Sequence, residues 1–220
     1  LGYFILQLKK TLEKPFIDLR IILTCHSPKG LLYKYDNYTG FNLPDYWTYQ
    51  MEKFCYKAAD AVIFPSLYIS DLVAKTFELS SKFYILPHPF EQVSFNLEDK
   101  PALASQDYFL YVGRLQRLKG IDELLSSFRR VWNADQFDGK LIIIGDDWFD
   151  ELTGNYYSEQ LLKKFQDLFE SGNVIWYRKL PPQSLMPMYQ DARALVFPSK
   201  VESYSYVVAE AMSMGGLIIS

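Results

Sequence analysis

Two glutamates near the end of the chain, Glu202 and Glu210, follow an apolar strand pattern, LVFPS. The run VESYSYVVAEAMSMGGLIIS predicts a loop that turns into a helix between them. Such a helix start offers backbone N–H groups and the positive end of the helix dipole, which suits a phosphate. Because a carboxylate accepts hydrogen bonds, the two glutamates could hold different hydroxyl groups of one elongated ligand. Hydroxyl groups on both sides of a phosphate suggest a nucleotide sugar.

A second group of candidate residues lies upstream, in YVGRLQRLKG at residues 111 to 120. The pattern predicts a buried strand, then Gly113, then a short loop with Arg114 and Lys119, and then a helix. When the bond between a sugar and a diphosphate breaks, negative charge grows on the bridging oxygen, and two cations beside peptide N–H groups can neutralise it. Cations that merely faced solvent would be disfavoured at a helix start by the dipole, which favours a functional role for this pair.

Together these two motifs resemble the donor-binding half of the family 4 glycosyltransferases, which have the GT-B fold. The resemblance is carried by Gly-Arg-Leu with Lys-Gly behind it, and by the spaced glutamates with Gly215 and Gly216 behind them. It covers most of the chain, more closely in the C-terminal half. It implies a retaining, hexosyltransferase-type enzyme of polysaccharide biosynthesis that moves a sugar from a nucleotide diphosphate sugar to a hydroxyl group of a glycan, lipid or small molecule. No metal and no cofactor besides the nucleotide sugar are expected.

The resemblance also implies roles for single residues. Glu202 would contact hydroxyl groups of the donor sugar, Glu210 the ribose hydroxyl groups, and His26 would orient the sugar from the acceptor side. Chemistry is therefore expected at Arg114, Lys119, Glu202 and His26. Donor binding is expected at Gly113, Glu210, Ser203, Tyr204, Ser205, Tyr206, Arg178, Lys179 and Leu180, the last three as a wall against the nucleobase.

Several positions depart from the family pattern. Arg178 stands where many members have glycine, and Asp147 stands where a second glycine is common. Tyr204 and Ser205 replace a frequent Phe-Gly pair. These changes would narrow the pocket. His88, between two prolines, is expected to be a structural residue at an interface rather than part of the chemistry.

Composition bounds the class of protein. The 220 residues are 49% hydrophobic and 17% aromatic, enough for one large or two small domains with ordinary cores. A net charge of −3 argues against a nucleic-acid-binding surface. No apolar run approaches the roughly 18 residues of a membrane-spanning helix, and no secretory signal is apparent, so a cytoplasmic location is expected, with peripheral contact at the inner face of the membrane left open.

The two cysteines, Cys25 and Cys55, have neither disulfide nor metal-ligand spacing. They are expected to be reduced thiols of the core. No cluster of His, Cys and carboxylate residues has metal-ligand spacing either, so the pattern predicts no metal site.

In the first half of the chain, the apolar runs DLRIILTCHS, AVIFPS and FYILPHP predict strands. Helical patterns at residues 45–60 and 71–77 separate them, which gives a βαβαβ order and hence a parallel sheet. The first strand is expected to be buried on both faces. The helix at 45–60 is expected to bury one side that carries Trp47, Met51, Phe54, Cys55 and Ala58.

Residues 91–106 lose apolar periodicity and predict an interdomain linker between a unit at 1–90 and a unit at 107–220. In the second unit, YFLYVG, KLIIIG, NVIWY, ALVFP and LIIS predict strands. Two apolar stripes at helical spacing predict core helices between them. The stripes are Ile121, Leu124, Leu125, Phe128, Val131 and Trp132, and then Leu161, Leu162, Phe165, Leu168 and Phe169.

The expected fold is thus α/β, with an acceptor-side and a nucleotide-sugar-binding Rossmann-like unit facing a cleft, where open parallel sheets bind ligands. The chain begins without methionine and stops on an apolar strand, GGLIIS. We interpret it as an excerpt of a longer enzyme, with both units partial. The resemblance implies that a glycine-rich acceptor loop and closing C-terminal helices are missing, which puts the activity of the excerpt alone in question.

Other functions stay open at this point. A glycoside hydrolase could use Glu202 and Glu210 as its carboxylate pair, about 5 to 5.5 Å apart if retaining and about 6.5 to 9.5 Å apart if inverting, but it would not need Arg114 and Lys119. A non-catalytic nucleotide-sugar-binding domain, a phosphorylase and an epimerase are further alternatives. A dehydrogenase is disfavoured because GRLQRLKG lacks the GxGxxG spacing.

Overall fold

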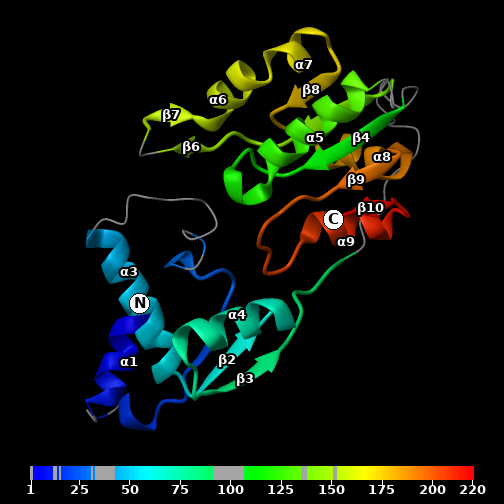
Figure 1. Cartoon of the computed structure of the whole chain (residues 1–220). Coiled ribbons are helices and arrows are strands. Elements are labelled where there is room, and N and C mark those ends of the chain that lie inside the picture. The colour runs from blue at the N-terminus through cyan, green and yellow to red at the C-terminus, as the bar shows by residue number, and fades with distance from the viewer. Residues whose placement is uncertain are drawn as a thin grey trace. The chain divides into compact units, whose positions relative to one another are not determined.

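The computed structural model describes residues 2–11, 14, 16–30, 32, 43–91, 107–134, 138–150 and 153–220. The chain divides into two compact units (Figure 1). The first comprises Leu1–Pro89 with Val201–Tyr204, and the second comprises Phe90–Lys200 with Ser205–Ser220. Apart from Glu91, the predicted linker at 91–106 lies outside the described residues.

The first unit contains a parallel sheet in the order β1-β2-β3, with β1 at Ile22–Thr24, β2 at Ala61–Phe64 and β3 at Lys82–Ile85. Helix α3 (Leu43–Ala58) connects β1 to β2, and helix α4 (Leu67–Phe77) connects β2 to β3. The predicted βαβαβ order is confirmed. Parallel strands need such crossover connections, and here the helices supply them.

The expectation that the first strand is buried on both faces is wrong for Ile22, which is 61% exposed. Within the described residues β1 and β3 lie at the two edges of the sheet, whereas β2 has a strand on either side. Val62 and Phe64 of β2 are accordingly inaccessible to solvent. An apolar run alone does not distinguish an edge strand from a central one.

Helix α3 buries the predicted side only in part: Ala58 is buried, and Met51, Phe54 and Cys55 are partly buried. Trp47 is 57% exposed, whereas Asp45 and Tyr56 are buried and Tyr49 packs against the core of the unit. The Tyr56 ring can be buried because its hydroxyl has a polar partner. This hydroxyl donates a hydrogen bond to the Cys25 sulfur at 3.1 Å.

Both cysteines are free, as predicted. Cys25 is buried, and this burial raises the pKa of its thiol to about 11. A thiol that stays protonated at neutral pH is a poor nucleophile, so Cys25 acts as a core residue.

An N-terminal helix, α1 (Gly2–Lys10), was not predicted and packs beside α3 (Figure 1). It is held to the start of the sheet by Asp60, which accepts from Lys9 and from the backbone N–H of Ile21, the latter at 2.7 Å. The hydrogen bond from Lys9 and that from Ile21 lower the pKa of Asp60 to about 2.

The second unit contains a parallel sheet in the order β10-β9-β4-β5-β8. Its strands lie where the sequence predicts them, at β4 (Tyr108–Val112), β5 (Lys140–Ile144), β8 (Val174–Tyr177), β9 (Ala194–Val196) and β10 (Ile218–Ile219). Side chains of the central strands alternate between two cores, because successive residues of a strand point to opposite faces. Leu141 and Ile143 face one core, and Ile142 and Ile144 face the other.

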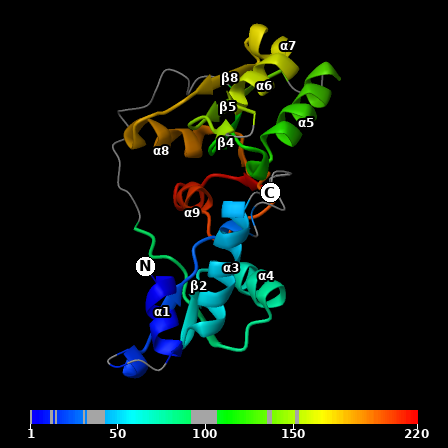
Figure 2. The ribbon, with the colours of Figure 1, turned by 90° about the vertical axis from the view of Figure 1, so that its left-hand side faces the viewer.

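Helices cover both faces of this sheet, as Figure 2 shows with α5 and α8 on opposite sides of it. One face packs against α5 (Ile121–Asn133), α6 (Tyr157–Lys164) and α7 (Gln166–Glu170). The other packs against α8 (Pro182–Asp191) and α9 (Tyr206–Ser213).

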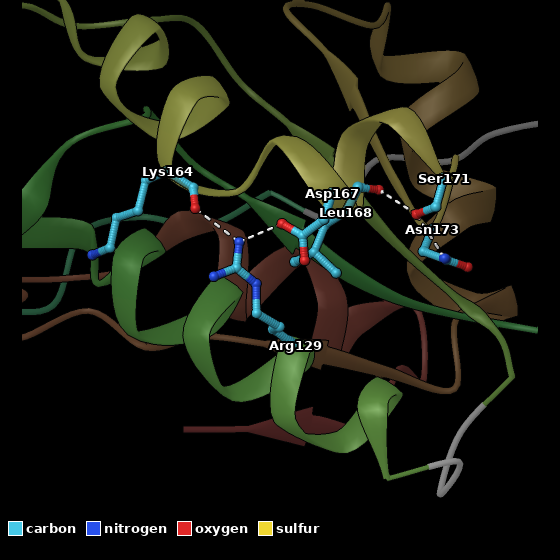
Figure 3. A network of polar contacts seen from close by, with 6 residues as sticks. All are labelled: Arg129, Lys164, Asp167, Leu168, Ser171 and Asn173. Carbon is cyan, nitrogen blue, oxygen red and sulfur yellow. Dashed lines mark hydrogen bonds and ion pairs between the residues drawn. The ribbon is translucent and has the colours of Figure 1, made fainter.

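The second predicted apolar stripe forms two helices instead of one, because the chain breaks at Phe165 between α6 and α7. Leu161, Phe165 and Leu168 are buried as predicted, but Leu162 is 40% exposed. Figure 3 shows how the break is held: Arg129 of α5 donates to the carbonyl of Lys164 at 2.8 Å and to the carboxylate of Asp167.

A short antiparallel hairpin, β6 (Phe149–Asp150) and β7 (Asn155–Tyr156), follows β5 and leads into α6. The rings of Phe149 and Tyr156 meet edge to face, with centroids 5.2 Å apart. This hairpin was not predicted from the sequence.

Candidate functional site

The candidate residues of the second unit follow parallel strands, so they belong to one edge of the sheet. Gly113 follows β4, Gly145 follows β5, and Arg178 follows β8. Strand β9, which pairs directly with β4, precedes the loop that leads to α9. This carboxyl edge is where open α/β sheets bind ligands.

The loop after β4 carries both candidate cations. Arg114 is exposed, and Lys119 is half-buried at the end of a 3₁₀ turn, η4 (Arg117–Lys119). Gly120 ends the turn at φ +70°, and a Cβ atom there would lie 2.1 Å from the carbonyl oxygen of Pro198. Together with the hydrogen bond from the Lys200 N–H to the Leu118 carbonyl, 2.9 Å long, this contact fixes the loop after β4 against the segment after β9.

The loop after β5 lies against the loop after β4. A Cβ atom on Gly145 would lie 2.0 Å from the carbonyl oxygen of Gly113, so only glycine fits this approach. The N–H of Leu115 donates to the carbonyl of Asp146 at 2.9 Å. The Asp147 carboxylate accepts from the backbone N–H of Ser158 at 3.0 Å, so it is directed to the start of α6.

Trp148 is a residue that the sequence analysis missed. The guanidinium of Arg114 lies over its indole ring, 5.4 Å from the centroid, which is a cation–π contact. The backbone N–H of Trp148 donates to the Asp147 carboxylate at 2.9 Å, and Trp148 is 40% exposed. The only signal in the sequence is a tryptophan shortly after Gly145, and nothing in the pattern links it to Arg114.

Helix α9 begins at a hydrogen-bonding cap. Ser205, at the N-cap, accepts from the Val208 N–H at 3.2 Å. Tyr206 is the first helical residue, and Glu210 lies about one turn further along the helix. The predicted change from loop to helix between the two glutamates is confirmed. Anion binding at the start of α9 stays a prediction.

Tyr189 of α8 is a second missed residue. Its hydroxyl donates to Oε2 of Glu210 at 2.8 Å, while its ring is fully buried. Burial raises the pKa of the Tyr189 hydroxyl, and the neighbouring Glu210 carboxylate raises it further, so the phenol stays protonated and donates. The sequence offered no signal for this pair, since Glu210 lies 21 positions after Tyr189.

Residues predicted to form a nucleobase wall follow β8. Arg178 and Lys179 are exposed, whereas Leu180 packs against the core that α8 and α9 share. The first two side chains are thus accessible to a ligand, and Leu180 is half-buried beneath the surface.

The remaining candidates belong to the first unit. His26 is exposed just after β1, and its ring stacks on that of His88 with centroids 5.0 Å apart and planes 18° from parallel. Glu202, Ser203 and Tyr204 lie in the short segment Val201–Tyr204, which groups with this unit.

The predicted residues therefore form two sets. Gly113, Arg114 and Lys119 lie in the second unit with Ser205, Tyr206, Glu210 and the residues after β8, and the other set lies in the first unit. A cleft shared by the two sets remains a prediction.

The described part of the chain holds no group of three or more His, Cys, Asp or Glu side chains placed to bind a metal ion. Among the same residues, no helix is long and apolar enough to cross a bilayer.

Comparison with curated proteins gives a partial match. The D-inositol 3-phosphate glycosyltransferase of Segniliparus rotundus is 30% identical over 117 residues, which are 53% of this chain and 25% of that protein. The chain thus spans about a quarter of this curated relative.

Solved structures match over nearly the whole chain. Sucrose-phosphate synthase from Thermosynechococcus elongatus has a TM-score of 0.68 at 21% identity, over 99% of this chain and 52% of that one. A mutant of S. aureus TarM, in complex with fondaparinux, alpha-GlcNAc-glycerol and UDP, has a TM-score of 0.65 at 14% identity, over 95% and 38%. An E. coli structure described as trehalose-6-phosphate bound with UDP-2-fluoro glucose has a TM-score of 0.64 at 12% identity, over 97% and 54%.

These likenesses show the fold, which is the α/β GT-B type predicted from the sequence, with a parallel sheet in each unit. The family is shown by a separate match. A model described as glycosyl transferases group 1 covers residues 94–220, more than half of the chain. The chain belongs to the glycosyl transferases group 1 family.

Proposed function

We propose that the protein is a retaining, metal-independent glycosyltransferase of family 4 that moves a sugar from a nucleotide diphosphate sugar to an acceptor hydroxyl group. The observation that carries this proposal is where three residues of the second unit lie in its elements. Arg114 and Lys119 follow β4, Glu210 lies one turn into the helix that follows the neighbouring strand β9, and the two segments pack at Gly120.

The chemical role of the loop after β4 is to stabilise the leaving diphosphate. The start of α9 and the two cations would neutralise the charge that develops on the diphosphate as the glycosidic bond breaks. Removal of one such preorganised donor costs roughly 3 to 4 kcal/mol of transition-state stabilisation, or about 100- to 1000-fold in rate.

The acidic residues would hold hydroxyl groups. Glu210 would accept from the ribose, while Glu202 and His26 would contact and orient the donor sugar. The acceptor oxygen would attack the face from which the diphosphate leaves, and a departing phosphate oxygen would take its proton. This route needs no dedicated protein base and no cofactor besides the donor.

Support for a nucleotide sugar as donor comes from two sides. The family is one of glycosyl transferases, and the solved neighbours of the same fold include complexes with UDP and with UDP-2-fluoro glucose. A glycan, a lipid-linked sugar or a small molecule would serve as acceptor.

The test is a product assay with UDP-, GDP- and ADP-linked sugars and a panel of acceptors. Lys119→Ala and Glu210→Ala are expected to abolish measurable transfer without loss of folding. Lys163→Ala and Glu159→Ala, at exposed positions of α6 in the same unit, are the matched controls and are expected to retain transfer.

Full activity in Lys119→Ala and Glu210→Ala would refute the assignment of the site. Cleavage of simple glycosides by the wild type without any nucleotide would instead support a hydrolase.

A further inference from the structure

The hydrogen bond between Tyr189 and Glu210 joins the two helices that cover one face of the second sheet. The hydroxyl of Tyr189 donates to Oε2 of Glu210, with 2.8 Å between the two oxygens. Because Tyr189 binds Oε2, the other carboxylate oxygen, Oε1, is the one that could accept a hydrogen bond from a ligand. A Glu side chain rotates broadly about its last torsion, so a fixed donor on one oxygen restricts where the other points.

The donor itself has a fixed position. The ring of Tyr189 is fully buried in the core with Tyr108, Met188 and Ala211. Its backbone is also held, because a Cβ atom on Gly216 would lie 2.6 Å from the Tyr189 carbonyl oxygen, so the chain before β10 passes directly against it. A buried phenol without a partner would be costly, and Glu210 is the partner that the structure gives it.

We propose that Tyr189 is a positioning residue that aims the Glu210 carboxylate at the ribose and so makes the site prefer ribonucleotides to 2′-deoxyribonucleotides. The inference rests on the proposed function, in which Glu210 accepts from ribose hydroxyl groups. The inference adds Tyr189, a residue of α8, to the proposed site. It also predicts a preference for ribonucleotides, which Tyr189 would not produce if it only packed in the core.

The test uses Tyr189→Phe, which removes only the hydroxyl group and keeps the ring in its core. Calorimetric titrations of the full chain with UDP, GDP and ADP identify the nucleotide that binds, and its 2′-deoxy form is then titrated. The wild type is expected to bind the ribonucleotide on the order of tenfold more tightly than its 2′-deoxy form.

Tyr108→Phe is the matched control. Tyr108 is 1% exposed in the same core, and its hydroxyl donates to the Met188 carbonyl at 3.2 Å, so this variant also removes one buried phenolic hydrogen bond. Melting temperatures of both variants separate any loss of folding from a loss of selectivity.

In Tyr189→Phe the affinity for the ribonucleotide is expected to fall roughly five- to tenfold while that for the 2′-deoxy form stays the same, so the preference disappears. Tyr108→Phe should keep the preference. In a Glu210→Gln background, Tyr189→Phe should cause little further change in the ratio of the affinities for the ribonucleotide and its 2′-deoxy form. The reason is that the two residues act as one unit.

An unchanged preference in Tyr189→Phe, or equal losses for both nucleotides, would overturn the inference while leaving the proposed function intact. A wild type that binds a nucleotide without any ribose preference would instead contradict the role of Glu210, and the inference would fall with it. A wild type that binds none of the three nucleotides would contradict the proposed function itself.

Discussion

Arg114 is an exposed cation that the structure nevertheless restrains. Its guanidinium lies over the Trp148 ring, and the backbone N–H of Trp148 donates to Asp147, which also accepts from the first turn of α6. An arginine stacked on an aromatic ring loses less freedom when it binds a phosphate than one in open solvent, because part of the ordering has already occurred.

Trp148→Ala is therefore expected to weaken binding of UDP, or of the nucleotide that the protein prefers, by about three- to tenfold. Phe149→Ala is the matched control, because Phe149 is 46% exposed next to Trp148 but contacts the ring of Tyr156. Calorimetric titration measures both variants. Equal affinities in Trp148→Ala and in the wild type would show that the ring does not order Arg114.

The contrast between Arg114 and Trp148 shows what a single sequence can predict about a site. Arg114, Lys119 and Glu210 can be proposed from the sequence because each has a recognisable place relative to an apolar strand or a helix start. Trp148 and Tyr189 were missed because their importance lies in contacts with a residue from another element, and no local pattern encodes such a contact.

Strands of the second sheet were predicted well because each is a short apolar run that ends at Gly, Pro or a polar residue. Helix α8 was missed, since Pro182 and Pro187 interrupt its pattern, yet the first stands at the helix start where its ring is tolerated. The break at Phe165 was also missed. It depends on Arg129 of another helix capping the carbonyl of Lys164, and helical periodicity carries no information about that contact.

Gly120→Ala tests how the loop after β4 is fixed. The position has φ +70° and a Cβ atom there would collide with Pro198, so the variant is expected to lose more than about 2 kcal/mol of stability and to bind the nucleotide more weakly. Gly172→Ala is the matched control, with φ +73° and no atom within 4 Å of the added Cβ, and should lose only about 1 kcal/mol. Denaturant unfolding measures both; similar losses would show that the contact with Pro198 is unimportant.

Asp60 gives the first unit a stability that depends on pH. Hydrogen bonds from Lys9 and Ile21 lower its pKa from 3.8 to about 2 in the folded protein, so the stabilisation is present above the unfolded pKa and is lost as the pH falls from about 4 to 2. Asp60→Asn should therefore lower the free energy of unfolding by about 1 to 2 kcal/mol at pH 7, a figure that already allows for partial exposure of the carboxylate. At pH 2 it should lower it by almost nothing.

Asp71→Asn, at an exposed position of α4, is the control for that change. Urea unfolding at pH 7, 4 and 2 measures both variants. An Asp60→Asn difference that is the same at all three pH values would refute the linkage.

Across the whole chain, the sequence predicted a GT-B fold and a donor site. The family match and the fold likeness agree with the predicted fold. The predicted residues divide between the two units. We propose that those of the second unit bind the nucleotide part of the donor, and that His26 and Glu202 of the first unit act on the sugar. Substitutions in the second unit should therefore reduce binding of both nucleotide and nucleotide sugar. Substitutions of His26 should affect the sugar donor alone.

The most direct measurement is a calorimetric titration of the full chain with UDP, GDP and ADP and with their sugar conjugates, on the wild type, Lys119→Ala and Lys163→Ala. We expect one nucleotide diphosphate to bind to the wild type and to Lys163→Ala, and Lys119→Ala to bind it at least about tenfold more weakly. Equal binding by all three proteins, or none by the wild type, would contradict this expectation.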